Sequence, residues 1–456
     1  MDHQNVCDSE WEAWSQRFTW TVWAAATVLA LVASAVYGRW LPWSDDFNIV
    51  PVVTGAVPLS LGWLWEQHEE HRIPLVKLLF VSMGRLSGCD YRWTLTANVV
   101  LLSATAAALI VAARRLRGFT SWTDAVFPAV ILHLGHGAMV WAFHSQFLLT
   151  TVLGGLFVAT AVAAPRGGAW RSAGMVVCAL LLPLTGSSGL LVSAAAMCLL
   201  AAEAAGWNAA PGTRLSLARV MAAGGACGTC AVGIAYVATL RFTQAKTYAG
   251  PWQTLVAGLD TLSSYPAGLV NRSPLGWRVA TAVAVVATCV MAARAMWSRD
   301  TSRRASLVIL VGYVAALGLV AIAIGYGRGT RDFSELYGHY SPLALGVPVA
   351  LALVWAALPQ APAARVVQAV LCIVALAVAS NHAKRAVRHW GMQDESWAVI
   401  ASDMRGVLSP EDVAARHAAA LFFIDTPDTR RMIATAIAAL RETTYPLYCT
   451  RPAAPP

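Results

Sequence analysis

Residues 38–93 read GRWLPWSDDFNIVPVVTGAVPLSLGWLWEQHEEHRIPLVKLLFVSMGRLSGCDYRW and interrupt a strongly apolar chain. They hold an acidic pair, Asp45 and Asp46, and a second polar cluster between Glu66 and Arg72. Only 12% of the 456 residues are charged, so this stretch concentrates the polar chemistry of the chain. Because apolar segments long enough to cross a bilayer flank it, the pattern predicts the first outer loop of a membrane protein.

The composition indicates an all-α polytopic membrane protein. Hydrophobic residues make up 57% of the chain, and apolar runs of nearly membrane-spanning length recur along it. The net charge of +9 comes almost entirely from arginines in short loops, which does not form the basic stripe of a nucleic-acid-binding protein. We therefore expect a lipid bilayer and no nucleic acid as partner. The excess of arginine over lysine and the many alanines favour a bacterial protein of the inner (cytoplasmic) membrane.

Arginine-rich short loops predict the topology, because such loops stay in the cytoplasm. The first group follows the second apolar segment, so the amino terminus is expected inside and residues 38–93 outside. Each later group must also be cytoplasmic, which requires an even number of spans between neighbouring groups. The groups are Arg114, Arg115 and Arg117; Arg166 and Arg171; Arg214 and Arg219; and Arg294 to Arg304.

This parity rule predicts about eleven transmembrane helices and an extracytoplasmic carboxy terminus. Residues 1–380 form the membrane domain, and residues 381–456 form a small tail of packed helices, with a helix start at Thr426-Pro-Asp428. A polar outer loop is expected at 240–275. The predicted spans are 17–38, 93–113, 121–143, 146–164, two within 172–206 divided at 185–189, 217–239, 276–296, 305–326, 341–358 and 364–380.

Asp45 and Asp46 follow the end of the first span closely. Carboxylates at the membrane edge can act as a general base toward an acceptor hydroxyl, or bind a divalent cation such as Mg²⁺ or Mn²⁺. A solvated turn is the alternative interpretation.

The stretch EQHEEHRIP, residues 66–74, is the second candidate. At helical spacing His68, His71 and Arg72 lie on neighbouring faces, and Glu66 and Glu70 are four residues apart. We expect one helix over 64–86 that covers the aspartates. An interfacial amphipathic helix without catalytic role is the alternative.

Three histidines, His133, His136 and His144, fall on one face of the predicted third span, and Gln146 follows them. Ionisable groups at membrane depth usually face a protein interior or a wet cavity. The row therefore predicts a polar cavity, with hydrogen-bonded structural histidines as the alternative.

The outer loop GYGRGTRDFSELYGHY, residues 325–340, carries Arg328, Arg331, His339 and Tyr340. Guanidinium groups bind phosphate oxygens in a bidentate way, so this loop is a candidate phosphate clamp. Interfacial anchoring is the alternative.

Taken together, the acidic pair after the first span, the polar outer loop and the number of spans resemble the GT-C superfamily of membrane glycosyltransferases. WLWEQHEEHRI at 63–73 after DDF at 45–47 is similar to a bacterial group of this superfamily. WAFHSQF at 141–147 and the 325–340 loop also resemble segments of that group, although His339 stands where the group has arginine.

The resemblance implies inverting transfer of a sugar from a polyprenyl-phosphate donor to a lipid, glycan or protein acceptor on the outer face. It implies that one of Asp45 and Asp46 is the catalytic base. It also implies that the donor phosphate meets the basic residues of the late outer loop. Independently of the resemblance, we expect Glu70, His71 and Arg72 to form a polar shell around the aspartates, with Arg72 or His71 as the neutralising partner and a divalent cation as the alternative. A polytopic transporter or lipid flippase, a glycan polymerase or ligase, and a scaffold without activity remain alternatives.

Two cysteines, Cys89 and Cys449, are expected outside the membrane in an oxidising compartment. They suggest a disulfide between the tail and the first loop. Cys227 and Cys230 are spaced C-x-x-C within a span, where a metal or redox site is not expected.

Overall fold

The computed structural model describes residues 3–135, 141–163, 168–207, 216–241, 248–267, 274–297, 301–330, 340–391, 394–422, 424–443, 445 and 448. Within these residues every regular element is a helix, apart from one bridge between His68 and His71. The all-α prediction is therefore confirmed for the described part of the chain.

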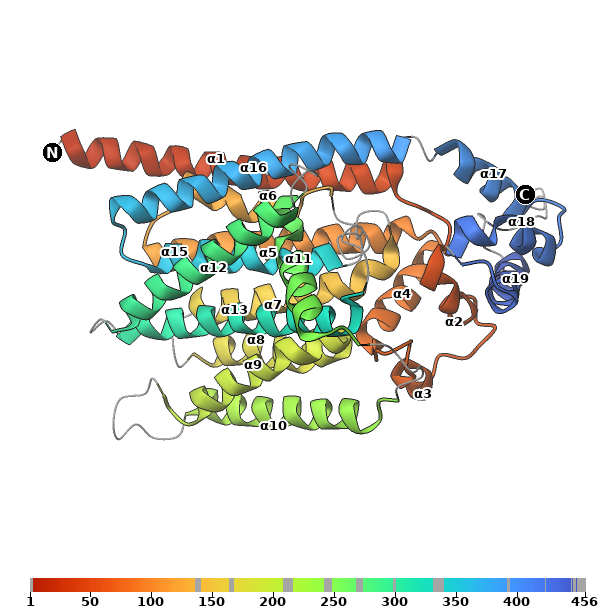
Figure 1. The fold of residues 1–456 in the computed structure, drawn as a ribbon, viewed down its shortest axis with the longest axis horizontal. Helices are drawn as coiled ribbons and strands as arrows, with labels where there is room; N and C mark the ends of the chain where they lie inside the picture. The colour runs from red at the N-terminus through yellow and green to blue at the C-terminus, as the bar shows by residue number, and fades with distance from the viewer. Residues whose placement is uncertain are drawn as a thin grey trace.

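The helices divide into a long bundle and a group of shorter elements at one end of it (Figure 1). The bundle contains α1 (His3–Tyr37), α5 (Arg92–Arg117), η2 (Trp122–Ala125), α6 (Val126–Ile131), α7 (Ser145–Ala163), α8 (Ala169–Leu181), η5 (Leu182–Thr185), α9 (Ser187–Ala204), α10 (Leu217–Ala238), α11 (Pro251–Ala267), α12 (Pro274–Met296), α13 (Thr301–Arg328), α15 (Gly346–Ala357) and α16 (Pro362–Gly391). The shorter elements are η1 (Ser44–Asn48), α2 (Val50–Thr54), α3 (Leu61–Trp65), α4 (Pro74–Ser87), η4 (Ala142–His144), α17 (Asp394–Arg405), α18 (Pro410–Phe422) and α19 (Pro427–Glu442).

Nine helices among the described residues are long and apolar enough to cross a membrane. Each lies at the position of a predicted span. Two shorter apolar helices, Trp122–Ile131 and Ala169–Thr185, occupy the positions of the predicted third and fifth spans. Both are shorter than the roughly 20 helical residues that usually cross a bilayer core of about 30 Å. A multi-pass membrane protein is confirmed, and the number eleven stays a prediction.

Two helices were not expected from the sequence. The predicted outer loop 240–275 contains α11, which packs against α13 and α12. Its buried Asp260 forms an ion pair with Arg278 of α12, with Arg278 Nε 2.5 Å from Asp260 Oδ1. The tail contains α18 as well as the two expected helices. The predicted start of α19 is confirmed, because the Thr426 hydroxyl accepts a hydrogen bond from the Thr429 amide and Pro427 begins the helix.

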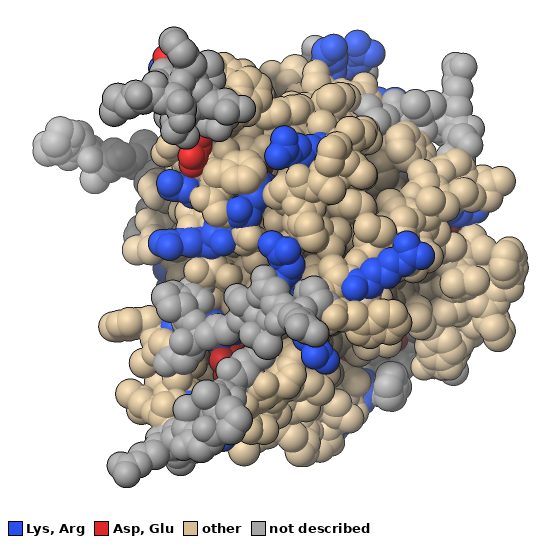
Figure 2. Space-filling view, turned by 90° about the vertical axis from the view of Figure 1, so that its left-hand side faces the viewer, with Lys and Arg blue, Asp and Glu red and all other residues tan. Residues whose placement is uncertain are grey.

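Basic side chains gather on the end of the bundle that faces away from the short elements (Figure 2). The last turn of α5 supplies Arg114, Arg115 and Arg117, and the last turn of α12 supplies Arg294. By the positive-inside rule we expect this end to be cytoplasmic and the short elements to be extracytoplasmic. The amino terminus lies at the basic end and the tail at the other (Figure 1).

The first outer loop and the tail share one hydrophobic core, separate from the core of the bundle. Leu41, Phe47 and Phe80 of the loop are buried together with Val413 and Ile433 of the tail. Below about 80 residues a single chain segment rarely builds a sufficient core. The tail is therefore stabilised by packing on the first loop, and the two form one unit, which the positive-inside rule leads us to expect outside the cytoplasm.

Side chains also link the two segments by hydrogen bonds. Trp43 Nε1 donates to the carbonyl of Ala420 at 3.0 Å. The hydroxyl of Tyr448 donates to the Cys89 carbonyl at 3.1 Å. Cys89 is buried, and its proposed partner Cys449 lies outside the described residues, so the disulfide stays a prediction.

Arg441 links α19 to the end of α17. Its guanidinium donates hydrogen bonds to the carbonyls of Asp403 and Met404 in α17 and of Leu408 just after it. Replacing Arg441 by Ala leaves these carbonyls without their donor and should destabilise the tail by about 1–3 kcal/mol. We expect faster hydrogen–deuterium exchange across α17 to α19 and unchanged exchange in the bundle. Arg431→Ala is the control, because that side chain is exposed on α19; equal exchange in both variants would contradict the assignment.

Candidate functional site

The polar cluster at 66–73 forms a tight turn and not the helix expected over 64–86. Helix α3 ends at Trp65, and α4 begins at Pro74. Between them the backbone amides and carbonyls of His68 and His71 exchange two hydrogen bonds of 2.8 Å. Glu69 adopts a φ of +50°. We call residues 66–72 the polar turn.

Two buried cations hold the polar turn in place. Arg72 is 7% exposed, and its guanidinium donates to the carbonyls of Trp65 and Thr239, the residue after α10. Its backbone amide donates to the hydroxyl of Tyr236 at 3.0 Å. Lys77 Nζ donates to the carbonyls of Trp63 and Glu66 at 2.8 Å each. Arg72 therefore anchors the polar turn to α10. Its hydrogen bonds are made with carbonyl groups, and not with the aspartates that it was expected to neutralise.

Asp45 lies beside the polar turn. Its carboxylate oxygen Oδ1 is 3.7 Å from His68 Nε2, and 27% of the Asp45 side chain is exposed. This separation is longer than a direct hydrogen bond, so the two groups are close neighbours without being hydrogen-bonded. The His68 ring also packs against Phe143, with ring centroids 4.8 Å apart.

Burial changes the protonation of both groups. It raises the pKa of Asp45 to about 6, and the nearby Glu69 carboxylate raises it further. Burial lowers the pKa of His68 to about 4, and the charges of His71 and Lys77 act in the same direction. At neutral pH Asp45 is therefore mostly ionised and His68 is neutral. A carboxylate with a pKa near the working pH is suited to general base catalysis.

Asp46 is different, although it is adjacent in sequence. It is 2% exposed, and its Oδ2 accepts a hydrogen bond of 3.1 Å from the Trp43 amide at the start of η1. Burial raises the pKa of Asp46 well above its ordinary value, and the Asp45 charge adds to this, while the hydrogen bond from Trp43 and the charge of Arg39 oppose it. Asp46 is therefore buried at the start of η1 and stabilises this turn through its hydrogen bond.

The polar turn also reaches two bundle helices. Arg328, the last residue of α13, has its NH2 group 4.0 Å from Glu70 Oε2. His71 Nδ1 hydrogen-bonds with the hydroxyl of Ser187, the first residue of α9. The polar turn therefore lies next to Asp45 through His68 and next to Arg328 through Glu70, although Arg328 follows Glu70 by more than 250 residues in sequence.

The predicted histidine row is wrong as a single helical face. Helix α6 ends at Ile131, so His133 lies in the following turn, and His144 lies in the separate helix η4. Buried His133 instead pairs with His382 of α16, with their Nδ1 atoms 2.7 Å apart. Gly135 approaches His382 so closely that a Cβ at that position would clash with the imidazole ring. His136 lies outside the described residues.

Three further predicted residues are buried near the outer end of the bundle. His144 packs on Trp141, with ring centroids 4.2 Å apart, and Tyr340 packs on Phe147 at 5.1 Å. Gln146 is buried at the start of α7. Glu66 is exposed, and its carbonyl accepts from Lys77. Arg331 and His339 lie outside the described residues.

No group of three or more His, Cys, Asp or Glu side chains is placed to hold a metal ion within the described part of the chain. A divalent cation therefore stays an expectation with no residue set assigned to it.

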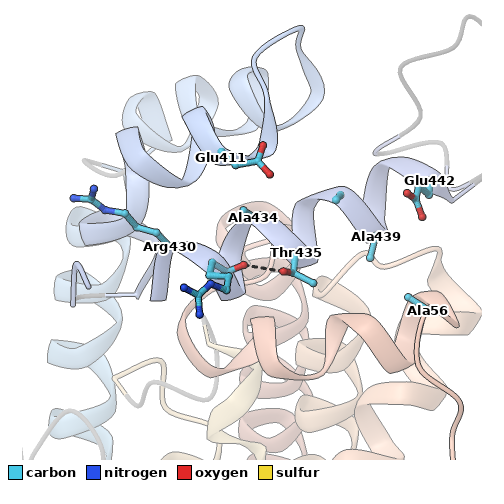
Figure 3. A pocket seen from close by; sticks show the side chains of 9 residues that line it. Ala56, Glu411, Arg430, Ala434, Thr435, Ala439 and Glu442 are labelled. Atoms are coloured by element: carbon cyan, nitrogen blue, oxygen red, sulfur yellow. Dashed lines mark hydrogen bonds between the residues drawn. The ribbon is translucent and has the colours of Figure 1, made fainter. Parts of the chain in front are cut away.

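A cavity of about 640 Å³ lies in the unit formed by the first loop and the tail, between α18, α19 and Ala56 at the end of α2. Ala434, Thr435 and Ala439 line it from α19, and Glu411 approaches it from α18 (Figure 3). None of the residues predicted for the site lines this cavity. Its position between tail and first loop is a consequence of their shared packing.

Sequence reasoning missed three residues at the site, namely Arg39, Lys77 and Ser187. Arg39 and Lys77 could have been identified from the sequence. Lys and Arg are uncommon in the outer loops of membrane proteins, so a cation in the first loop is usually kept for a functional or structural role. The pKa of Arg39 is lowered to about 10 by burial, and that of Lys77 to about 8. Ser187 carried no signal of its own.

The raised pKa of Asp45 predicts a destabilising role. Because the folded-state pKa of about 6 exceeds its ordinary 3.8, folding stability falls as pH rises from about 4 to 6 and stays lower above that. Asp45→Asn removes this loss, so the variant should be more stable than the wild type above pH 6, by at most about 3 kcal/mol. Thermal unfolding at several pH values measures the difference. Asp428→Asn, at an exposed position, is the control, and a pH-independent difference for Asp45→Asn would contradict the assignment.

Comparison of the chain with protein-family models, with curated proteins and with solved structures finds no match. The site therefore has to be interpreted from its own geometry and chemistry.

Proposed function

We propose that the protein is a membrane glycosyltransferase that moves a sugar from a polyprenyl-phosphate donor to an acceptor hydroxyl at the outer membrane surface. One observation carries the proposal. The polar turn contacts a partly exposed carboxylate with a raised pKa, Asp45, and also contacts a cation at the outer end of a span, Arg328. Sugar transfer from a phosphodiester needs both a base and a positive group for the departing phosphate.

The reaction assigns Asp45 as the base. Its carboxylate takes the proton of the acceptor hydroxyl while that oxygen bonds to the anomeric carbon of the sugar. The bond between the anomeric carbon and the phosphate oxygen breaks, and polyprenyl phosphate leaves with the bonding electrons. Attack from the side opposite the leaving group inverts the anomeric configuration. His68, neutral and 3.7 Å from Asp45, is placed to hydrogen-bond the acceptor or a bridging water.

Arg328 is assigned to the donor phosphate. It ends α13, where the negative end of the helix dipole favours a cation. Among the described residues it forms an ion pair with Glu70, and the separation of 4.0 Å is longer than a charge-assisted hydrogen bond. A phosphate that offers two oxygens at hydrogen-bond distance would therefore compete well for this guanidinium.

The two aspartates then have separate roles. Asp46 keeps η1 in shape through its hydrogen bond with the Trp43 amide, and burial raises its pKa well above the ordinary value, which favours the protonated form. An uncharged Asp46 does not repel the Asp45 carboxylate, so Asp45 can ionise. Asp46 is a positioning residue, and Asp45 is the catalytic residue.

Asp45→Asn should abolish transfer, with a loss of about 10²-fold or more, because an amide cannot accept the acceptor proton. Asp46→Asn should only reduce it, because an amide oxygen can still accept the hydrogen bond from Trp43. Proteoliposomes supplied with a panel of polyprenyl-phosphate-linked sugars and a membrane extract as acceptor measure the release of polyprenyl phosphate.

Asp428→Asn on the tail is the matched control and should keep full activity. Full activity of Asp45→Asn would refute its role as base. Movement of the intact donor across the bilayer without release of polyprenyl phosphate would instead support a transporter or flippase.

Glu70→Gln should strengthen the binding of polyprenyl phosphate by about twofold to fivefold, because it removes the carboxylate that competes for Arg328. Arg328→Gln should weaken the same binding. Glu69→Gln removes an equal charge from the neighbouring residue and is the control. Fluorescence or calorimetric titration in nanodiscs measures the affinities without any need for turnover. Unchanged affinity in both Glu70→Gln and Arg328→Gln would place the phosphate elsewhere.

A further inference from the structure

The chain between α2 and the polar turn is both apolar and exposed. Residues 47–65 contain no charged side chain. Residues 55–62 are all exposed, and Leu61, the first residue of α3, is 85% exposed. Val57 and Leu59 are exposed as well. A water-soluble surface seldom presents a run of this kind without a partner.

Three hydrogen bonds fix the position of α3 and the polar turn relative to the end of α10. Trp65 Nε1 donates to the Thr239 hydroxyl at 3.4 Å. The Gln67 side chain exchanges hydrogen bonds with the backbone of Arg241. Thr239 and Arg241 directly follow α10, a candidate membrane span. Helix α3 therefore lies beside the end of α10 (Figure 1), at the level where a span formed by α10 would leave the membrane.

The neighbouring surface of α10 is itself apolar and outward-facing. Ile234 and Val237, in the last turns of α10, are exposed in the isolated chain and are expected to contact lipid. Helix α3 has five residues and is thus about 7.5 Å long, which keeps Leu61 within about a helix length of this boundary. The exposed leucines of 55–62 are therefore continuous with a lipid-facing surface.

The composition of α3 fits the same location. Its sequence, LGWLW, places two tryptophans beside the boundary. Tryptophan is enriched at the level of lipid head groups, where its ring is buried and its N–H is hydrated or hydrogen-bonded. Trp63 and Trp65 are half-buried and lie under the cations Lys77 and Arg72 respectively. The apolar side chains that these contacts leave exposed are those of Leu59 and Leu61.

We infer that residues 55–65 insert into the outer leaflet of the membrane and anchor the first loop there. The partner is the phospholipid of that leaflet, with the leucines among the acyl chains and the tryptophans at head-group level. Since the polar turn follows α3 directly, this anchor sets the site at the membrane surface. The inference does not depend on the proposed transfer reaction, because it concerns only the placement of 55–65.

Photo-crosslinking in proteoliposomes tests the inference. A benzophenone amino acid is placed at position 61, at 234 on the lipid-facing side of α10, and at 407 on the tail. Val407 is fully exposed, like Leu61, but belongs to the turn between α17 and α18. We expect phospholipid adducts at 61 in an amount similar to those at 234 and several-fold above those at 407, measured by mass spectrometry.

If position 61 forms no more phospholipid adducts than position 407, the inference is overturned. Adducts to a second copy of the chain in place of lipid would overturn it as well. A second measurement uses Leu61→Asp and Val407→Asp. If 55–65 inserts, spin-labelled lipids that quench a fluorophore at position 59 should quench it less in Leu61→Asp and equally in Val407→Asp. Equal quenching in both variants would count against insertion.

Discussion

The site depends on the buried guanidinium of Arg72. It donates to carbonyls on both sides of the polar turn, one at the end of α3 and one just past the end of α10. A buried charge without such partners would cost several kcal/mol, so these contacts hold the turn in a single position. That position brings His68 to Asp45, His71 to Ser187 and Glu70 to Arg328. Sequence separation between the contributing segments matters little once the turn is fixed.

The same constraint explains why a first loop and a tail at opposite ends of the chain form one unit. The polar turn and Lys77 hold one side of the loop against the bundle. The other side, with Phe47 and Val53, remains apolar and is covered by α19. A tail of this size does not build a sufficient core alone. The loop supplies the missing half, and the tail in turn shields the loop from water.

The sequence predicted those features of the fold that depend on a local pattern of residues. Apolar runs gave the positions of the nine long helices, and Thr426-Pro-Asp428 gave the start of α19. It did not predict the polar turn, because the residues that hold it, Tyr236 and Thr239, are more than 160 positions away. Helical spacing of charges is equally compatible with a helix and with a turn until such contacts are known. The histidine row failed for the same reason, since His133 pairs with His382, which is 249 positions away in the sequence.

Asp45 and Asp46 show why residue type and spacing alone could not assign the base. They have the same side chain, follow each other in η1 and differ only in what surrounds them. Asp46 is buried, so the charged form loses its hydration and its pKa is raised well above the ordinary value. Asp45 faces the polar turn, where partial exposure keeps its pKa at about 6. Two adjacent ionised carboxylates would repel each other at short range. By burying one of them, the fold leaves the other both charged at neutral pH and basic enough to accept a proton.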